Sequence, residues 1–91
     1  MAAPITGYLI TGRAAFEMRR RGIAEGVVRS VVAAPEQRHE VRPGRDVLQS
    51  RIPRAGKTYL IRVFVDVDRT PAEVVTVYRT SRVEKYWRAQ R

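Results

Sequence analysis

The pattern of hydrophobic and polar positions differs between the two halves of the chain. Residues 11–34 place their apolar side chains at helical spacing, whereas residues 45–80 alternate between apolar and polar positions. Helical spacing brings every third or fourth residue to one face, and alternation is typical of a strand with one buried face. The pattern therefore predicts helices followed by strands, which is the composition of an α+β domain.

Two consecutive helices are predicted in the first half. The first begins at Gly12 or Arg13, because the Thr11 hydroxyl can cap it, and Gly22 suits the left-handed residue that ends it. The second spans residues 24–33 and ends before Pro35. Its apolar stripe consists of Ile23, Val27, Val28, Val31 and Val32. Because the two helices are joined by only two residues, we expect a helical hairpin or corner.

Strands are predicted in the second half. The candidates are a weak strand over residues 37–42, three stronger strands over 46–53, 58–66 and 73–80, and a short edge strand over 8–11. The turns at 54–57 and 68–71 are too short for a parallel crossover, so the strands they join must be antiparallel. Ser81 can cap a final helix over residues 81–89. The prediction is one domain, residues 1–91, with two helices on a twisted antiparallel sheet of three to four strands and a C-terminal helix.

Composition excludes several kinds of site. The chain has no cysteine, which excludes disulfides and thiolate catalysis, and its one histidine, His39, excludes a histidine-rich metal centre. Asp66 and Asp68 have a spacing that can hold Mg²⁺, but the following Arg-Thr-Pro is ordinary turn chemistry and no further ligands are nearby. We therefore expect neither a metal nor a small-molecule cofactor.

Charge indicates the class of partner. The formal net charge is +9, which favours a polyanion such as RNA or an acidic protein. Of the 18 basic residues, all are arginine except Lys57 and Lys85. This bias reflects either a genome that favours arginine codons or a need for bidentate phosphate contacts. The longest uninterrupted apolar run, residues 31–34, is too short to span a bilayer. No export signal is visible, so we expect a cytoplasmic protein without membrane contact.

The end of the last predicted strand is one candidate site. Tyr78 lies on one face of that strand and Arg79 on the other, close enough to its end for twist to bring them together. Three further basic residues follow at helical spacing: Arg82, Lys85 and Arg88. From residue 79 to residue 91 there are five basic residues and one acid, a net charge of +4. The segment is either a solvated helix with an aromatic anchor or the rim of an RNA site.

The sheet offers a second candidate. Arg51 and Arg62 lie in the middle of adjacent predicted strands, and Lys57 lies at the turn between them. They are either ordinary exposed side chains or a clamp for one phosphate. His39 lies in a polar stretch, where a lone histidine is either a surface residue or a general acid or base.

Two groups of motifs support a family resemblance. The helical part contains Ile10-Thr11-Gly12-Arg13-Ala14, Met18, Arg21-Gly22-Ile23, Val27, Val31 and Pro35, and the strands contain Tyr59-Leu60-Ile61-Arg62-Val63 and Val75-Thr76-Val77-Tyr78. Over about residues 8–88 their order resembles the RelE/ParE toxin-like superfamily, and more closely a small uncharacterised branch of it. The resemblance implies a microbial RNase-like fold. It also implies a toxin that cleaves messenger RNA, often on the ribosome, and an antitoxin partner.

One position departs from the pattern. Members of that branch often have a histidine where this chain has Arg13, and arginine cannot act as a base near neutral pH. Relatives in the superfamily also include inhibitors of DNA gyrase and proteins without known activity. The open alternatives are therefore a ribonuclease, a non-catalytic module that binds nucleic acid or protein, and a gyrase-inhibiting toxin.

Under the ribonuclease hypothesis the ribose 2′-hydroxyl attacks the adjacent phosphate without a metal. Arg62 and Arg79 stabilise the transition state, and Tyr78 relays a proton or stacks on a base. The predicted RNA-binding residues are Arg13, Arg51, Lys57, Arg82, Lys85 and Arg88.

Overall fold

The first helix forms where its capping residues predict. In the computed structural model, which describes residues 3–89, α1 spans Gly12–Arg21. The Thr11 hydroxyl accepts a hydrogen bond from the backbone N–H of Ala14 at 3.2 Å. Gly22 ends the helix with a φ of 67°, in the left-handed region that glycine adopts without strain. The second helix, α2, follows at Glu25–Ala33.

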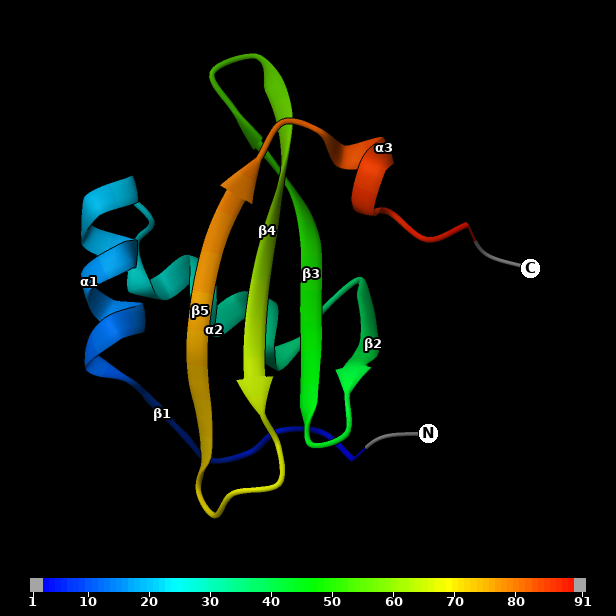
Figure 1. The fold of residues 1–91 in the computed structure, drawn as a ribbon. Coiled ribbons are helices and arrows are strands. Elements are labelled where there is room, and N and C mark those ends of the chain that lie inside the picture. The colour runs from blue at the N-terminus through cyan, green and yellow to red at the C-terminus, as the bar shows by residue number, and fades with distance from the viewer. Residues whose placement is uncertain (1–2, 90–91) are drawn as a thin grey trace.

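Five strands form a single sheet in the order β1-β5-β4-β3-β2 (Figure 1). Their bounds are Tyr8–Ile10 for β1, Gln37–Arg42 for β2, Arg45–Arg54 for β3, Lys57–Asp66 for β4 and Ala72–Thr80 for β5. The pairs β2–β3, β3–β4 and β4–β5 are antiparallel, whereas β1 runs parallel to β5. The turn between β3 and β4 uses left-handed residues at Ala55 and Gly56, which suits a tight hairpin.

The prediction of an antiparallel sheet with three to four strands was wrong. The sheet has five strands and is mixed, because β1 adds a parallel strand beside β5. Pairing of Tyr8 with Ala72 joins segments that are distant in the chain, so no local pattern signals it. The polar segment β2 is a full strand because β3 supplies its hydrogen-bonding partner.

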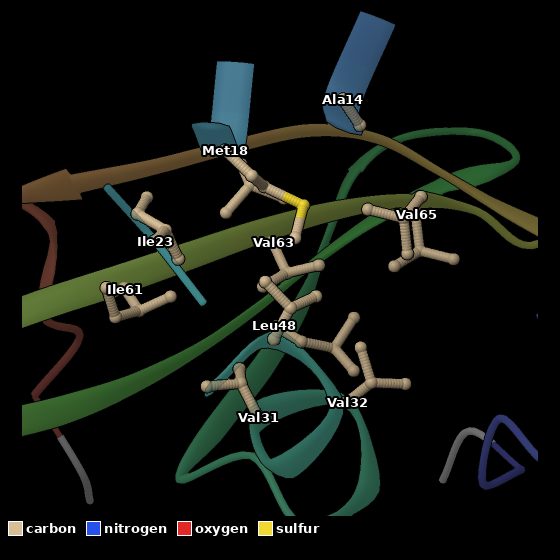
Figure 2. Packing of buried hydrophobic residues seen from close by; sticks show 12 residues of the cluster. Ala14, Met18, Ile23, Val31, Val32, Leu48, Ile61, Val63 and Val65 are labelled. Carbon is tan, nitrogen blue, oxygen red and sulfur yellow. The ribbon is translucent and has the colours of Figure 1, made fainter. Parts of the chain in front are cut away.

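The hydrophobic core lies between the sheet and the first two helices. Both helices lie behind the sheet in Figure 1, with α1 beside β5. Met18 of α1 and Val31 of α2 point toward Leu48 and Val63 on the strands, as Figure 2 shows. These four side chains are at most 6% exposed. Burial of Leu48 and Val63 against the helices determines which face of β3 and of β4 points inward.

The C-terminal helix is shorter than predicted. α3 spans only Val83–Tyr86, and none of its residues is buried. Ser81 does not cap it: Arg82 occupies the capping position, and the backbone N–H of Arg82 donates to the hydroxyl of Thr80 at 3.1 Å. Trp87 is already extended. Within residues 3–89, no helix has the length and apolar character needed to cross a membrane.

Candidate nucleic-acid interface on the open sheet face

The candidate site lies on the sheet face opposite α1 and α2, which we call the open face. Strand register places four polar side chains of this face in one row across β2, β3, β4 and β5. Gln37 pairs with Gln49, Gln49 with Arg62, and Arg62 with Tyr78. We call these four residues the polar row. Directly paired side chains on one face are close enough to bond, so the register alone brings them together.

Hydrogen bonds connect the polar row from end to end. Gln49 donates to the Gln37 side-chain oxygen at 2.7 Å. The Nε of Arg62 donates to Gln49 at 2.9 Å, and its Nη1 donates to the Tyr78 hydroxyl at 2.6 Å. Gln49 is fully buried and Arg62 is 9% exposed. The guanidinium is therefore held in one place by neutral groups.

Aromatic rings surround the Arg62 guanidinium. Its central carbon lies 4.4 Å from the ring centre of Tyr86, 5.3 Å from that of Phe64 and 5.7 Å from that of Tyr78. The Phe64 and Tyr78 rings stack at 6.0 Å, and Tyr86 meets Tyr78 edge-on at 6.2 Å. A cation over ring faces is stabilised electrostatically, but it keeps its full positive charge.

Arg62 has no carboxylate partner among residues 3–89. The salt bridges of this part of the chain involve other arginines, such as Arg38 with Asp46 and Arg45 with Asp66. Within the same residues, only two of the five guanidinium N–H donors of Arg62 bond to protein acceptors. A confined, uncompensated cation with donors to spare is suited to binding an anion.

The other end of the polar row holds the C-terminal segment. Gln37 donates to the Arg88 carbonyl at 2.6 Å and accepts from the Arg88 N–H at 3.1 Å. Gln49 donates to the Tyr86 carbonyl at 3.1 Å. The two amides therefore bond to backbone groups of Tyr86 and Arg88, where the chain leaves α3. They also place the Tyr86 ring over Arg62.

His39 lies on the same face, one row away. It pairs with Val47, which pairs with Phe64, so His39 belongs to the row that neighbours Arg62. Burial is the largest cause that lowers the pKa of His39 below its ordinary value, and the charges of Arg88 and Arg62 lower this pKa further. The imidazole is therefore neutral over a wider pH range than an exposed histidine.

The predicted catalytic group is only partly assembled. Arg62 and Tyr78 are in contact, but Arg79 lies on the helix-covered face. Its Nη2 donates to the Arg21 carbonyl at 3.0 Å, and its guanidinium lies 5.8 Å from the Tyr59 ring centre. Strand twist does not overcome the alternation of side chains, so Arg79 is separated from Arg62 by the sheet itself.

The predicted RNA-binding residues do not form one surface. Arg51 makes a two-pronged salt bridge with Glu36 and stacks 4.2 Å from the Trp87 ring centre, so its charge is compensated. Arg13 is on α1, behind the sheet, 80% exposed and 3.9 Å from Glu17. Lys57 begins β4 at the hairpin turn.

The basic residues around α3 lie closer to the polar row. Arg82 precedes α3 and Lys85 lies within it, with the Lys85 ammonium 5.3 Å from the Tyr86 ring centre. The charge of Arg88 acts on His39. Of the six predicted contacts, these three belong to the segment that lies against the open face.

The acidic pair Asp66 and Asp68 is not arranged as a metal site. Arg45 donates two hydrogen bonds to the Asp66 carboxylate, at 2.6 and 3.2 Å, and holds its pKa below the usual range. Between residues 3 and 89, no group of three or more potential metal-ligating side chains occurs.

Sequence reasoning missed several residues of the site, namely Gln37, Gln49, Phe64 and Tyr86. One local signal was present: Gln49 occupies a position between Leu48 and Ser50 in a strong strand, and it alternates onto the face of Val47. A glutamine that must be buried needs partners, and this requirement points to its cross-strand neighbours.

Comparison of the chain with protein-family models, with curated proteins and with solved structures finds no significant match.

Proposed function

We propose that this protein binds RNA on the open face and cleaves it by metal-independent attack of the ribose 2′-hydroxyl on the adjacent phosphate. The observation that carries the proposal is Arg62, a nearly buried guanidinium without a carboxylate partner in residues 3–89. The sequence resemblance to the RelE/ParE toxin-like superfamily supports the choice of RNA as the anion.

The chemistry assigned to each group follows from its contacts. The free N–H donors of Arg62 bind the phosphate and stabilise the extra negative charge of the transition state. Because the Tyr78 hydroxyl accepts from Arg62, its own proton is directed elsewhere and can reach the leaving 5′-oxygen. Bases stack on the aromatic rings beside the guanidinium.

Partner and location are part of the same proposal. The resemblance implies an acidic antitoxin protein, and the net charge of +9 is compatible with such a partner. RNA as substrate implies action in the cytoplasm.

The proposal is tested with purified protein and a short mixed-sequence RNA in the presence of EDTA. We expect fragments that end in a 2′,3′-cyclic phosphate and a 5′-hydroxyl. The matched 2′-deoxy oligonucleotide should bind and remain intact, because it lacks the attacking group. Intact RNA at every pH tested, with or without added divalent metal, refutes the ribonuclease function.

A second candidate is a non-catalytic module that binds nucleic acid through the same face. The observation in its favour is Arg13, which stands where the related branch often has histidine and lies on a helix behind the sheet. Binding of RNA without cleavage, weakening steeply with salt and weakened by Arg62→Gln, distinguishes this module from the nuclease.

A further inference from the structure

The proposed reaction needs a group that accepts the 2′-hydroxyl proton. Arg62 cannot accept a proton near neutral pH, because a guanidinium remains protonated. The Tyr78 hydroxyl already accepts a hydrogen bond from Arg62 at 2.6 Å. Arg79 lies on the other side of the sheet. None of the three residues named from the sequence therefore supplies the base.

His39 is placed to supply it. It is the single histidine of the chain, and strand register sets it on the open face in the row next to Arg62. Its cross-strand neighbour on this face, Val47 of β3, is fully buried, and β3 is the strand between His39 on β2 and Arg62 on β4. The side chain is half-buried, which leaves part of the ring accessible to a ligand.

Burial opposes protonation of His39 most strongly and lowers its pKa, and the charges that face the ring lower this pKa further. Arg88 of the C-terminal segment and Arg62 of β4 both oppose a positive charge on the ring, and only Asp46 of β3 favours it. The Asp46 carboxylate is itself bonded to Arg38 at 2.8 Å. A neutral imidazole beside an anion-binding cation is the combination that general-base attack on a phosphodiester requires.

We propose that His39 is the catalytic base, a role that rests on the proposed ribonuclease function. The ring nitrogen of His39 takes the 2′-hydroxyl proton as the O2′–P bond forms. The P–O5′ bond breaks, and the departing 5′-oxygen takes the proton of the Tyr78 hydroxyl. His39 then loses its proton to water and Tyr78 regains one, so no other reactant is consumed. The products are a 2′,3′-cyclic phosphate and a 5′-hydroxyl.

The test compares wild type, His39→Gln and His39→Ala on the mixed-sequence RNA. Glu40→Gln is the matched control, since Glu40 is the next residue and is exposed. We expect His39→Gln to lower kcat by about 10²-fold or more. Binding of the 2′-deoxy analogue should stay within about twofold, because the phosphate site is intact.

Two readouts separate a base from a structural role. The kcat/KM of wild type should rise with pH to a plateau, with an inflection below the ordinary histidine pKa of about 6.5, and His39→Gln should lack this inflection. Added imidazole should restore part of the activity of His39→Ala but not that of an Arg62→Gln variant.

The outcomes distinguish this inference from the proposed function. If wild type cleaves RNA and His39→Gln cleaves it within about threefold of wild type, His39 is not the base, while the nuclease stands. The same conclusion follows if His39→Ala is inactive, correctly folded by its melting temperature, and unaffected by imidazole. If wild type leaves RNA intact, both proposals fail together.

Discussion

Arg45 and Arg62 lie on the same open face, on the adjacent strands β3 and β4, but their charges have different partners. Arg45 starts β3 and donates two hydrogen bonds to the Asp66 carboxylate. Arg62, in the middle of β4, is bonded to an amide and a phenol and is surrounded by aromatic rings. The first charge is neutralised within the protein, whereas the second is confined without being neutralised.

The difference teaches that the net charge of +9 says little about where an anion binds. At the end of the sheet formed by the β2–β3 and β4–β5 turns, Asp46, Asp66 and Glu73 lie near Arg38, Arg45 and Arg69. Those cations stabilise the fold. The middle of the open face has the one nearly buried arginine of residues 3–89, Arg62, and its partners are neutral.

Removing each guanidinium in turn should give the largest difference between Arg62 and Arg45. Arg62→Gln should lower the kcat for RNA cleavage by about 10²–10³-fold, the usual cost of losing a preorganised contact to the transition-state charge. Arg45→Gln should leave kcat within about threefold of wild type. Single-turnover cleavage assays measure both. Equal losses in the two variants would mean that Arg62 has no special role.

For the free energy of unfolding, the salt bridge of Arg45 with Asp66 should matter. Asp66→Asn removes the partner of Arg45, and we expect it to destabilise the fold by about 1 kcal/mol, a value reduced by the partial exposure of the pair. For a chain of this size that is a fall in melting temperature of about 5 °C. Thermal unfolding followed by circular dichroism tests this, with the exposed Glu40→Gln as control. No shift beyond that of the control would show that the salt bridge contributes nothing.

Lowering the pH should reduce the stability of the fold in two separate ranges, one set by His39 and one by Asp66. The pKa of His39 is lowered in the folded state, so the folded protein binds fewer protons and stability falls as the pH drops below about 6.5. The pKa of Asp66 is lowered mainly by its hydrogen bonds with Arg45. Its contribution is therefore present above the ordinary aspartate pKa and is lost as the pH falls through the lower folded value.

Urea unfolding across this pH range checks both parts. His39→Gln should flatten the dependence nearer neutrality, and Asp66→Asn should flatten the one in stronger acid. A profile that neither variant changes would contradict the assignment.

The salt dependence of nucleic-acid binding gives the smallest expected difference between Arg62 and Arg45. Each phosphate contact releases about one counterion, so Arg62→Gln should reduce the slope of log K against log salt by about 1 for the 2′-deoxy analogue. Arg45→Gln should leave the slope unchanged, because its charge is already paired. Fluorescence anisotropy titrations over a salt series measure these slopes. An unchanged slope for Arg62→Gln would place the phosphate elsewhere.

The sequence predicts those elements whose signals are local. Thr11 and Gly22 mark the ends of α1, Pro35 follows α2, and the turn around Gly56 joins two alternating strands. Alternation of apolar and polar residues also predicts the strands β3 and β4, since alternation is a property of the chain itself. Tyr78 and Arg62 were named as candidates from composition and position alone.

The site depends on relations that the chain does not encode locally. The sequence could place Gln49 and Arg62 on strands, but their pairing depends on the register, which is set by the hairpin and the burial of the inner face. The C-terminal segment bonds to Gln37 and Gln49, which come from the distant strands β2 and β3. The parallel pairing of β1 with β5 likewise needs the whole fold.

By itself, then, the sequence determined the first two helices, the alternating strands and a surplus of arginine. Periodicity, capping and composition are written in neighbouring residues, and they do not depend on the rest of the chain. Only the tertiary structure decided that a nearly buried arginine, Arg62, has no carboxylate partner within residues 3–89, because that depends on which acids the fold brings to each base. It separated Arg79 from Arg62 and placed His39 on the same face as Arg62, with β3 between their strands, since a sheet isolates its two faces and joins residues across strands.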